Sequence, residues 1–568
     1  MRTSEELRSS LRSIDRRSYP AYKSLAGSWS FGRYVLNIEH VQGDPFAAPS
    51  QLSVTVDGRT AGFPAAFWEA RWDRTALEDY LLRRFGRQAG RFSHQAKGSG
   101  KSGVLAVTVP GQEVVERTDC EVRGGAVTLR FEAGFPADGR TINARELEKI
   151  LFDFLPVCVE QGLLYATAPK GEPERVIELA EDRRFVREEL ERLGLAAFVA
   201  DGAVLPRESG VSDRPMRDAV PFQSPESMAV TLNLPHRGAV RGMGIRRGIT
   251  LIAGGGYHGK STLLKALERG VYDHVAGDGR EFVITDSTAV KIRAEDGRKV
   301  TDTDISLFIN RLPSGRDTSR FSTLDASGST SQAANISEAL EAGSKVLLMD
   351  EDTSATNFMV RDELMQSVIA RGQEPITPFL ERALDLWQKA GVSLILVVGS
   401  CGAYFYTADC VIQMDAYHAK DITSEAKAAL EGRTAPTLSA PGFHLPVCGR
   451  TVDLSGSTQT RRNYRGGGTR QERLKVRRFG KTAFSVGERE LDLRYVEQLV
   501  DGGQTQALAY MVRYAQENLA GQRVDAVVAA LTRLIAERGL GAVCGGGNVP
   551  AGVAVPRVQE IFACFNRY

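Results

Sequence analysis

The chain is 568 residues long, which corresponds to about three or four domains of average size. With 42% hydrophobic and 25% charged residues, its composition is that of an ordinary globular protein, which excludes disordered, collagen-like and membrane-spanning classes. The 72 Lys and Arg residues nearly balance the 70 Asp and Glu residues, so the net charge of +2 by itself gives no sign of a polyanionic partner.

The charge is distributed unevenly along the chain. Residues 431–568 hold 19 basic and 12 acidic residues, whereas the preceding 430 hold 53 basic and 58 acidic ones. The C-terminal region is therefore positive and the remainder mildly negative, which favours the C-terminal region as the place where a polyanion binds.

Targeting and redox signals are absent from the sequence. The N-terminal residues contain no apolar stretch before a small-residue cleavage site, and apolar runs such as 392–398 are far shorter than the roughly 20 residues that span a bilayer. The seven cysteines are scattered and form no C-x-x-C pair, as in proteins of a reducing compartment. We expect a soluble, cytoplasmic protein.

Residues 1–225 form the first of three regions. Alternating apolar and polar residues predict strands at 51–56, 104–109 and 126–131, and apolar residues three and four apart predict helices at 144–162 and 174–193. We expect an α+β domain that ends in a polar, proline-bearing linker over 205–225.

The second region, residues 226–430, repeats a strand, loop and helix pattern. Its short apolar strands, of the kind found in sheets covered on both faces, are predicted at 249–253, 345–349, 393–398 and 410–414. The third region, residues 431–568, is basic, and helices are predicted in it at 492–518 and 524–538.

A phosphate-binding loop follows the first strand of the second region. The motif G-x-x-x-x-G-K-[ST] stands between that strand and a helical pattern, which is the context that the motif requires. Lys260 would reach the terminal phosphates, and the Ser261 hydroxyl would bind Mg²⁺. The predicted ATP-binding residues are Gly254, Gly255, Gly256, Tyr257, His258, Gly259, Lys260, Ser261 and Thr262. Of these, His258 occupies a variable position and either contacts phosphate or faces solvent.

An acidic pair at the end of the strand 345–349 completes the predicted metal site. Asp350 would hold Mg²⁺ through water, and Glu351 would polarise the water that attacks the nucleotide. We therefore assign Glu351 and Lys260 to the catalytic residues, and Ser261 and Asp350 to the metal ligands.

The segment 327–340, which begins Ser-Gly-Ser-Thr-Ser-Gln, resembles the signature helix of ABC ATPases, and 352–357 resembles their D-loop. In that family two ATPase domains meet head to tail. The resemblance thus implies a homodimer in which Ser327, Gly328 and Ser329 complete the ATP site of the opposite subunit.

Two departures from the ABC pattern count against a transporter subunit. Ser400 stands where the family has its switch histidine, so we assign Ser400 to the catalytic residues. No glutamine lies between Thr262 and Ser331, so the Q-loop is missing, and we assign Asp304 as its metal-binding substitute; a solvated acidic residue of a loop is the alternative interpretation.

A closer resemblance covers nearly the whole chain. Five segments (40–47, 254–262, 289–298, 326–335 and 350–359) resemble a family of predicted ATPases of the ABC class, which is widespread in bacteria and similar to a trypanosome mitochondrial protein linked to RNA editing. The resemblance implies an α/β fold with an ABC-type P-loop NTPase core, an α+β N-terminal domain and a basic, largely helical C-terminal domain. It also implies nucleic-acid work coupled to ATP.

The segment 461–481 is the strongest candidate for a nucleic-acid contact, because it holds nine basic residues and one acidic residue with interleaved aromatics. A solvated basic loop is the alternative interpretation. The candidate contacts are Arg461, Arg462, Tyr464, Arg465, Arg470, Arg473, Lys475, Arg477, Arg478 and Lys481. We expect a Mg²⁺-dependent ATPase that binds RNA; a DNA-repair or chromosome-organising ATPase acting on DNA is the alternative.

Overall fold

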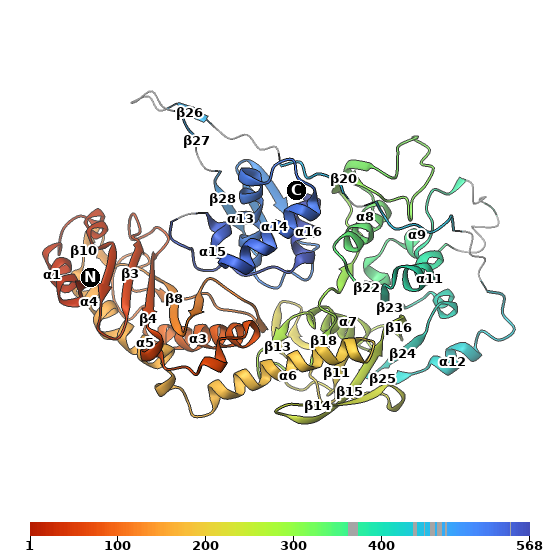
Figure 1. Cartoon of the computed structure of the whole chain (residues 1–568), viewed down its shortest axis with the longest axis horizontal. Helices are drawn as coiled ribbons and strands as arrows, with labels where there is room; N and C mark the ends of the chain where they lie inside the picture. Colours follow the sequence, from red (N-terminus) through yellow and green to blue (C-terminus); the bar gives the residue numbers. More distant parts are fainter. Residues whose placement is uncertain are drawn as a thin grey trace. The chain divides into compact units, whose positions relative to one another are not determined.

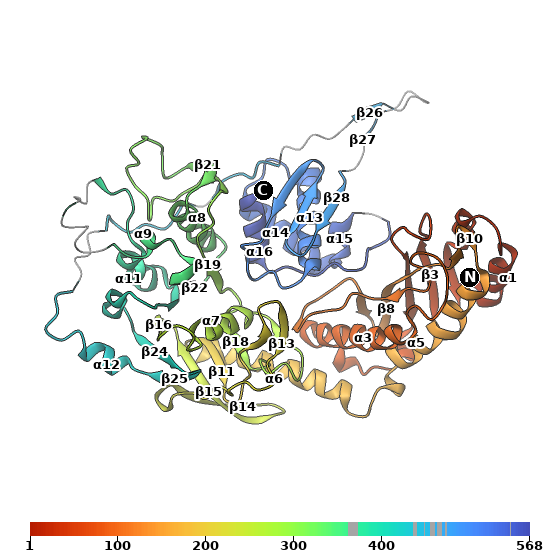
Figure 2. The same ribbon diagram turned by 180° about the vertical axis from the view of Figure 1, so that it is seen from behind.

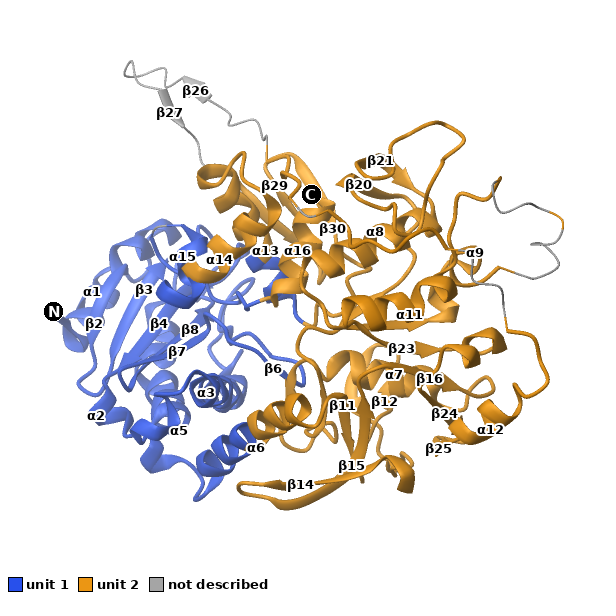
Figure 3. Ribbon diagram, turned by 45° about the vertical axis from the view of Figure 1, so that its right-hand side comes forward, with its two compact units in different colours: residues 1–181, 501–507, 535–555 blue, residues 182–500, 508–534, 556–568 orange. Residues whose placement is uncertain are grey.

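The computed structural model describes residues 1–361, 368, 373–435, 440–447, 449–454, 460–462, 469–471, 474–545 and 547–568. It divides into two compact units, coloured blue and orange in Figure 3. Unit 1 comprises residues 1–181, 501–507 and 535–555, and unit 2 comprises residues 182–500, 508–534 and 556–568. Helices α6 (Glu172–Arg192), α13 (Gly502–Asn518) and α14 (Val524–Arg538) each contribute residues to both units.

Unit 1 is built on a seven-stranded sheet with the order β1-β2-β3-β4-β8-β5, in which β7 also pairs with β8. In β8 every second side chain is buried, so one face of the sheet packs on the core. The strands are β1 (Arg2–Thr3), β2 (Gly27–Ser30), β3 (Val35–His40), β4 (Ser50–Val56), β5 (Leu105–Ala106), β7 (Cys120–Arg123) and β8 (Ala126–Ala133). The predicted strands at 51–56 and 126–131 are confirmed, whereas only two residues of 104–109 lie in a strand.

Helices cover the buried face of this sheet, where Trp29, Phe85 and Phe131 are fully buried. They are α1 (Ser4–Ser13), α3 (Arg71–Phe92), α4 (Ala144–Glu148) and α5 (Leu155–Leu163), with a π-helical turn at Lys149–Phe154 between the last two (Figure 1). The helical patterns predicted at 144–162 and 174–193 are confirmed by α4, α5 and α6. Mixed strands and helices around one core make this an α+β unit, as expected.

The central sheet of unit 2 has the order β19-β22-β23-β16-β24-β25, and all neighbours are parallel except β24 and β25. Every residue of β22 and β23 is buried, as expected of parallel strands covered on both faces. Its strands are β16 (Ile249–Ala253), β19 (Val290–Ile292), β22 (Val346–Asp350), β23 (Ser393–Val397), β24 (Cys410–Asp415) and β25 (His418–Asp421). Of these, β16, β22, β24 and β25 are labelled in both Figure 1 and Figure 2. All four strands predicted for this region are confirmed.

The helices of unit 2 include α7 (Lys260–Arg269), α8 (Gly328–Glu341), α11 (Phe379–Ala390) and α12 (Thr423–Ala428). A second, antiparallel sheet has the order β14-β15-β11-β18. Its strands are β11 (Leu195–Ala200), β14 (Ala229–Leu234), β15 (Gly238–Arg246) and β18 (Val283–Thr285). The segment 205–225, expected to be a linker, carries the hairpin of β12 (Arg207–Ser209) and β13 (Ser212–Pro215).

The C-terminal residues form a three-stranded antiparallel sheet, β28 (Val476–Phe479), β29 (Ala483–Val486) and β30 (Arg489–Asp492), followed by helices. The prediction of a helix from residue 492 is wrong, because α13 begins only at Gly502. Asp501 accepts a hydrogen bond from the Gly503 amide at 2.6 Å and so marks the helix start, while Leu493 and Leu499 are buried in the irregular segment before it. The helix predicted at 524–538 is confirmed by α14.

The remaining elements are short, apart from α16 (Val558–Arg567), β20 (Arg298–Thr303) and β21 (Phe321–Ala326). They are α2 (Gly58–Ala61), β6 (Glu113–Val114), β9 (Ala137–Asp138), β10 (Thr141–Ile142), β17 (Asp273–His274), α9 (Thr356–Met359), β26 (Thr460–Arg462), β27 (Thr469–Gln471) and α15 (Gly541–Cys544). Within the described part of the chain, no helix combines the length and the apolar character needed to cross a bilayer.

Candidate nucleotide-binding site

The loop between β16 and α7 has the backbone of a phosphate-binding loop. Gly254, Tyr257 and Gly259 have positive φ angles of 138°, 65° and 100°, which turn successive amides in different directions. A Cβ on Gly254 would lie 2.4 Å from the Met414 carbonyl oxygen, so only glycine fits there. The Lys260 Nζ donates hydrogen bonds of 2.7 Å to the carbonyl oxygens of Gly254 and Gly255. The backbone of the loop 254–259 therefore surrounds the ammonium group of Lys260.

The two aromatic residues of the loop have different surroundings. Tyr257 is fully exposed. His258 Nδ1 accepts a hydrogen bond of 2.9 Å from the Ala416 amide and lies 3.3 Å from the Asp415 carboxylate, in the turn between β24 and β25. The structure thus places the His258 ring against this turn, rather than leaving it free in solvent.

Ser261 and Asp350 meet at the carboxyl edge of the parallel sheet. The Ser261 hydroxyl donates to Asp350 Oδ2 at 3.3 Å, and Asp350 is buried at the end of β22. Hydroxyl and carboxylate oxygens are the ligands that Mg²⁺ prefers, and one or two of them suffice when substrate phosphates supply the others. These two residues therefore fit a magnesium ion.

Glu351 is held by the loop that follows β23. Its Oε2 accepts hydrogen bonds from the amides of Gly399 at 2.7 Å and Ser400 at 3.1 Å, and its Oε1 accepts one from the Ser400 hydroxyl. Burial raises the pKa of Glu351, but these hydrogen bonds and the Lys260 charge outweigh it and hold the pKa below its ordinary value. Ser400, which stands where the ABC pattern has its switch histidine, therefore contributes to the lowered pKa of Glu351.

The signature segment forms the start of α8. Ser327 is its N-cap and accepts a hydrogen bond of 3.4 Å from the Thr330 amide, and Ser329 is buried. A Cβ on Gly328 would lie 3.1 Å from an Asp296 carboxylate oxygen. Among the described residues, no hydrogen bond or ion pair joins 327–329 to the loop 254–262 of the same chain.

The structure does not bring Asp304 to the metal ligands. Its carboxylate is buried and accepts hydrogen bonds from the amides of Ser306 and Val447, each at 3.0 Å, and from the Ser306 hydroxyl. Both oxygens are therefore occupied by local groups, and the contacts of Asp304 lend no support to its assignment as a metal ligand.

The predicted nucleic-acid segment is described only in part. Tyr464, Arg465 and Arg473 lie outside the described residues, and Arg461, Arg462 and Arg470 belong to β26 and β27. The remaining four, Lys475, Arg477, Arg478 and Lys481, are exposed on or beside β28.

Sequence reasoning missed how β19 is held. β19 pairs in parallel with β22, and β20 pairs with β21. Arg293, which follows β19, forms an ion pair of 2.5 Å with Glu497. No sequence signal could have found this pair, because 204 residues separate its members.

Three family models match consecutive parts of the chain. The model of the ABC ATPase P-loop domain matches residues 170–443, and that of the N-terminal part of ABC-class ATPases matches residues 4–166. The MRB1590 C-terminal domain model matches residues 475–568. The chain belongs to the ABC-class ATPases. This confirms the predicted family and the α/β fold with an ABC-type core.

Individual relatives of this ABC-class ATPase overlap with it in part. The uncharacterised protein MJ1628 of Methanocaldococcus jannaschii is 32% identical over 249 residues, which are 42% of this chain and 54% of MJ1628. The chain thus aligns with about half the length of that curated relative.

Solved structures also overlap only in part. CbiO1 of Clostridium perfringens, part of an ABC transporter complex, is 14% identical with a TM-score of 0.25, over 42% of this chain and 92% of its own. MJ1267, an ATP-binding cassette of an ABC transporter in its ADP conformation, is 15% identical with a TM-score of 0.24, over 35% and 89%.

Proposed function

We propose that this ABC-class ATPase hydrolyses ATP with the help of Mg²⁺, closes as a homodimer around the nucleotide and binds RNA through its basic C-terminal region. The observation that carries the ATPase reaction is the meeting of four side chains at the carboxyl edge of one parallel sheet. Lys260 and Ser261 follow β16, Asp350 ends β22, and Glu351 is held by the loop after β23.

Each of these residues has a distinct part in the reaction. Lys260 exchanges its two carbonyl partners for phosphate oxygens, while Ser261 and Asp350 hold the metal ion, which would neutralise charge on the phosphates. Glu351, whose carboxylate accepts hydrogen bonds from the Ser400 hydroxyl and from the amides of Gly399 and Ser400, accepts a proton from the attacking water.

Replacement of the general base tests this reaction. Glu351→Gln should lower kcat by a factor of about 10² to 10⁴ while ATP still binds. Ser400→Thr, which retains a hydroxyl, serves as the matched control and should keep most of the activity. Turnover by Glu351→Gln at the wild-type rate would refute the assignment of Glu351 as base.

The homodimer is proposed because, among the described residues, no hydrogen bond or ion pair joins 327–329 to the phosphate-binding loop 254–262 of the same chain. Ser327 and its neighbours present a hydroxyl and amides at the start of α8, which are suited to bind a γ-phosphate. Size-exclusion chromatography of Glu351→Gln should show a dimer with MgATP and a monomer without nucleotide. A monomer under both conditions would contradict the proposal.

RNA binding is proposed from one face of β28. Arg477 and Phe479 are two residues apart on an edge strand, so they share a face, and Phe479 is 45% exposed. Lys475 precedes them in the same alternation and is also exposed. An exposed aromatic ring beside cations is suited to stack on an unpaired base while the cations bind phosphates.

Crosslinking in cells tests the partner. Glu351→Gln, which should remain closed on ATP, is crosslinked and the bound nucleic acid is recovered and sequenced. Predominantly RNA supports the proposal, and predominantly duplex DNA would favour a DNA-repair or chromosome-organising role. Recovery of neither would refute nucleic-acid binding and leave the ATPase reaction intact.

A further inference from the structure

A short segment before α13, residues 495–498, attaches the C-terminal region to the ATPase core. Gln498 is 3% exposed, and its side-chain amide and main-chain carbonyl form hydrogen bonds with residues of the core. Its Nε2 donates hydrogen bonds of 3.1 Å to the carbonyl oxygens of Glu268 and Ala289, and its Oε1 accepts one of 3.0 Å from the Lys291 amide. Its own carbonyl oxygen accepts a hydrogen bond of 2.9 Å from the Tyr272 hydroxyl. Gln498 therefore binds main-chain groups on two separate core elements.

Both elements are connected to the proposed nucleotide-binding residues. One element carries such a residue at its opposite end, and the other pairs with a strand that ends in one. Glu268 lies in the last turn of α7, the helix that begins with Lys260. Lys291 lies in β19, which pairs in parallel with β22, the strand that ends in Asp350. Because a helix of this length is stiff, a shift of its last turn tilts its first turn as well. Gln498 thus fixes the distance between the element that carries Lys260 and the strand beside Asp350.

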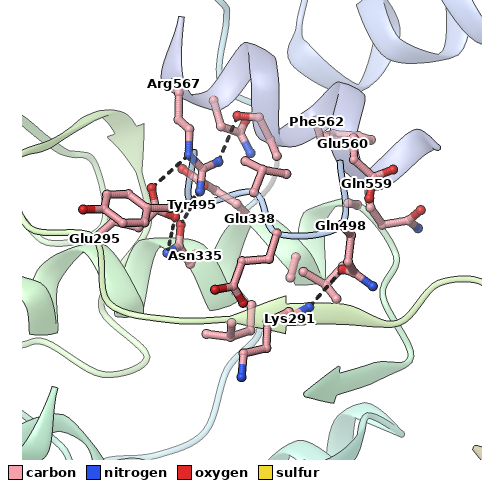
Figure 4. Close-up of a pocket in the computed structure, with 18 residues that line it drawn as sticks. Lys291, Glu295, Asn335, Glu338, Tyr495, Gln498, Gln559, Glu560, Phe562 and Arg567 are labelled. Carbon is pink, nitrogen blue, oxygen red and sulfur yellow. Dashed lines mark hydrogen bonds and ion pairs between the residues drawn. The ribbon is translucent and has the colours of Figure 1, made fainter. Parts of the chain in front are cut away.

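The neighbours of Gln498 reinforce this attachment. Glu497 forms an ion pair of 2.5 Å with Arg293, and the Arg293 guanidinium lies 4.7 Å from the centre of the Tyr495 ring. The Lys291 side chain is partly buried. As Figure 4 shows, the Lys291 main chain faces Gln498 while its side chain extends away from that residue.

A second contact joins the C-terminal region to the signature helix. Arg567 in α16 forms an ion pair of 2.5 Å with Glu295 and donates a hydrogen bond of 3.0 Å to Asn335 of α8 (Figure 4). The cavity between these contacts measures about 50 Å³, far below the roughly 300 Å³ at which ligand pockets begin. Its lining residues therefore serve to hold elements together rather than to bind a metabolite.

We infer that Gln498 is a positioning residue of the ATP site, through which the C-terminal region sets the placement of α7 relative to β19. This inference rests on the ATP hydrolysis proposed above. On this inference, the rate of ATP turnover depends in part on the C-terminal region, to which we assign none of the phosphate or metal ligands.

The test compares two substitutions of glutamine within the same cavity. Gln498→Leu removes the three side-chain hydrogen bonds at nearly constant volume. Gln559→Leu is the matched control, because Gln559 lines the same cavity from α16 and is not bonded to α7 or β19 in the described structure. We expect Gln498→Leu to lower kcat about tenfold with KM for ATP within about twofold, and Gln559→Leu to change neither by more than about twofold.

The unfolding temperature separates positioning from a purely structural role. A lower unfolding temperature for Gln498→Leu, with kcat per folded molecule within twofold of wild type, would overturn the inference. If Gln498→Leu does not fold, Glu497→Gln, which breaks the ion pair to Arg293 and leaves Gln498 in place, should lower kcat by about threefold. An unchanged kcat in that variant would likewise overturn the inference.

Failure of the proposed function is visible in a different measurement. Absence of turnover by the wild-type protein would refute ATP hydrolysis. The rise of the unfolding temperature on addition of ATP then tests positioning by itself, with a smaller rise expected for Gln498→Leu than for wild type and Gln559→Leu. Equal rises in all three proteins would overturn the inference.

Discussion

The buried ion pair between Arg567 and Glu295 offers a quantitative test of how α16 is attached to the core. Both side chains are less than one-tenth exposed, and their nitrogen and oxygen atoms lie 2.5 Å apart. Burial raises the pKa of Glu295, but the charges of Arg567 and Arg298 and hydrogen bonds from Arg567 and Asn335 outweigh it and lower the pKa to about 2. Because the unfolded chain has the ordinary value near 4.5, Glu295 stabilises the folded state.

The size of this stabilisation follows from the two pKa values. At 1.36 kcal/mol for each pH unit between them, Glu295 contributes about 3 kcal/mol to the free energy of unfolding. A folded pKa below the unfolded one means that this contribution is complete above about pH 4.5 and is lost as the pH falls towards 2. Arg567→Met removes the main partner and leaves a buried carboxylate, so we expect a loss of about 3 kcal/mol at pH 7.

The assay is thermal unfolding of wild type, Arg567→Met and Arg567→Lys between pH 7 and pH 3. In a unit of roughly 360 residues, a loss of 3 kcal/mol lowers the unfolding temperature by about 4 °C. The difference between wild type and Arg567→Met should shrink as the pH falls below 4.5, and Arg567→Lys should retain part of the stability. A difference that stays constant across this pH range would refute the role assigned to Glu295.

Three further predictions concern the ATP site and the basic face. Ser400→Ala removes a hydrogen bond that lowers the pKa of Glu351, so the acidic limb of the pH profile of kcat/KM should move to higher pH; an unmoved limb would exclude Glu351 as the titrating base. Gly254→Ala places a methyl group 2.4 Å from the Met414 carbonyl oxygen, so ATP should no longer raise the unfolding temperature, which differential scanning fluorimetry measures. Phe479→Ala should weaken single-stranded RNA binding by about 1 to 3 kcal/mol without changing its salt dependence, because a stacked ring neutralises no phosphate; an unaltered affinity in fluorescence anisotropy titrations would rule out stacking there.

Local chemistry explains why the core could be predicted in detail. The loop 254–262 combines glycines that tolerate positive φ with a lysine and a serine at fixed spacing, and each of these properties belongs to the residue itself. The apolar strands before Asp350 and Gly399 are likewise short, continuous and fully buried. Such features can be predicted without knowledge of how the rest of the chain folds.

The wrong helix start after Asp492 and the unsupported role of Asp304 both depend on contacts that sequence patterns do not describe. The spacing of apolar residues after Asp492 is helical, yet Leu493 and Leu499 are buried through turns of an irregular segment. Asp304 follows a strand as a metal ligand would, but amides of Ser306 and Val447 occupy its oxygens. Periodicity and motif spacing carry no information about which remote backbone groups will form hydrogen bonds with a side chain.

The sequence by itself determined the phosphate loop, the acidic pair and the family, since these depend on residue types at short, fixed spacings. Only the tertiary structure decided that Ser400 holds Glu351 and that Gln498 joins α7 to β19. These contacts connect residues 49 to 230 positions apart, so they arise only after the parallel sheet has brought its strand ends together. The physical reason is that a buried polar group needs a hydrogen-bond partner, and which group lies close enough is determined by the tertiary fold and not by the order of residues in the chain.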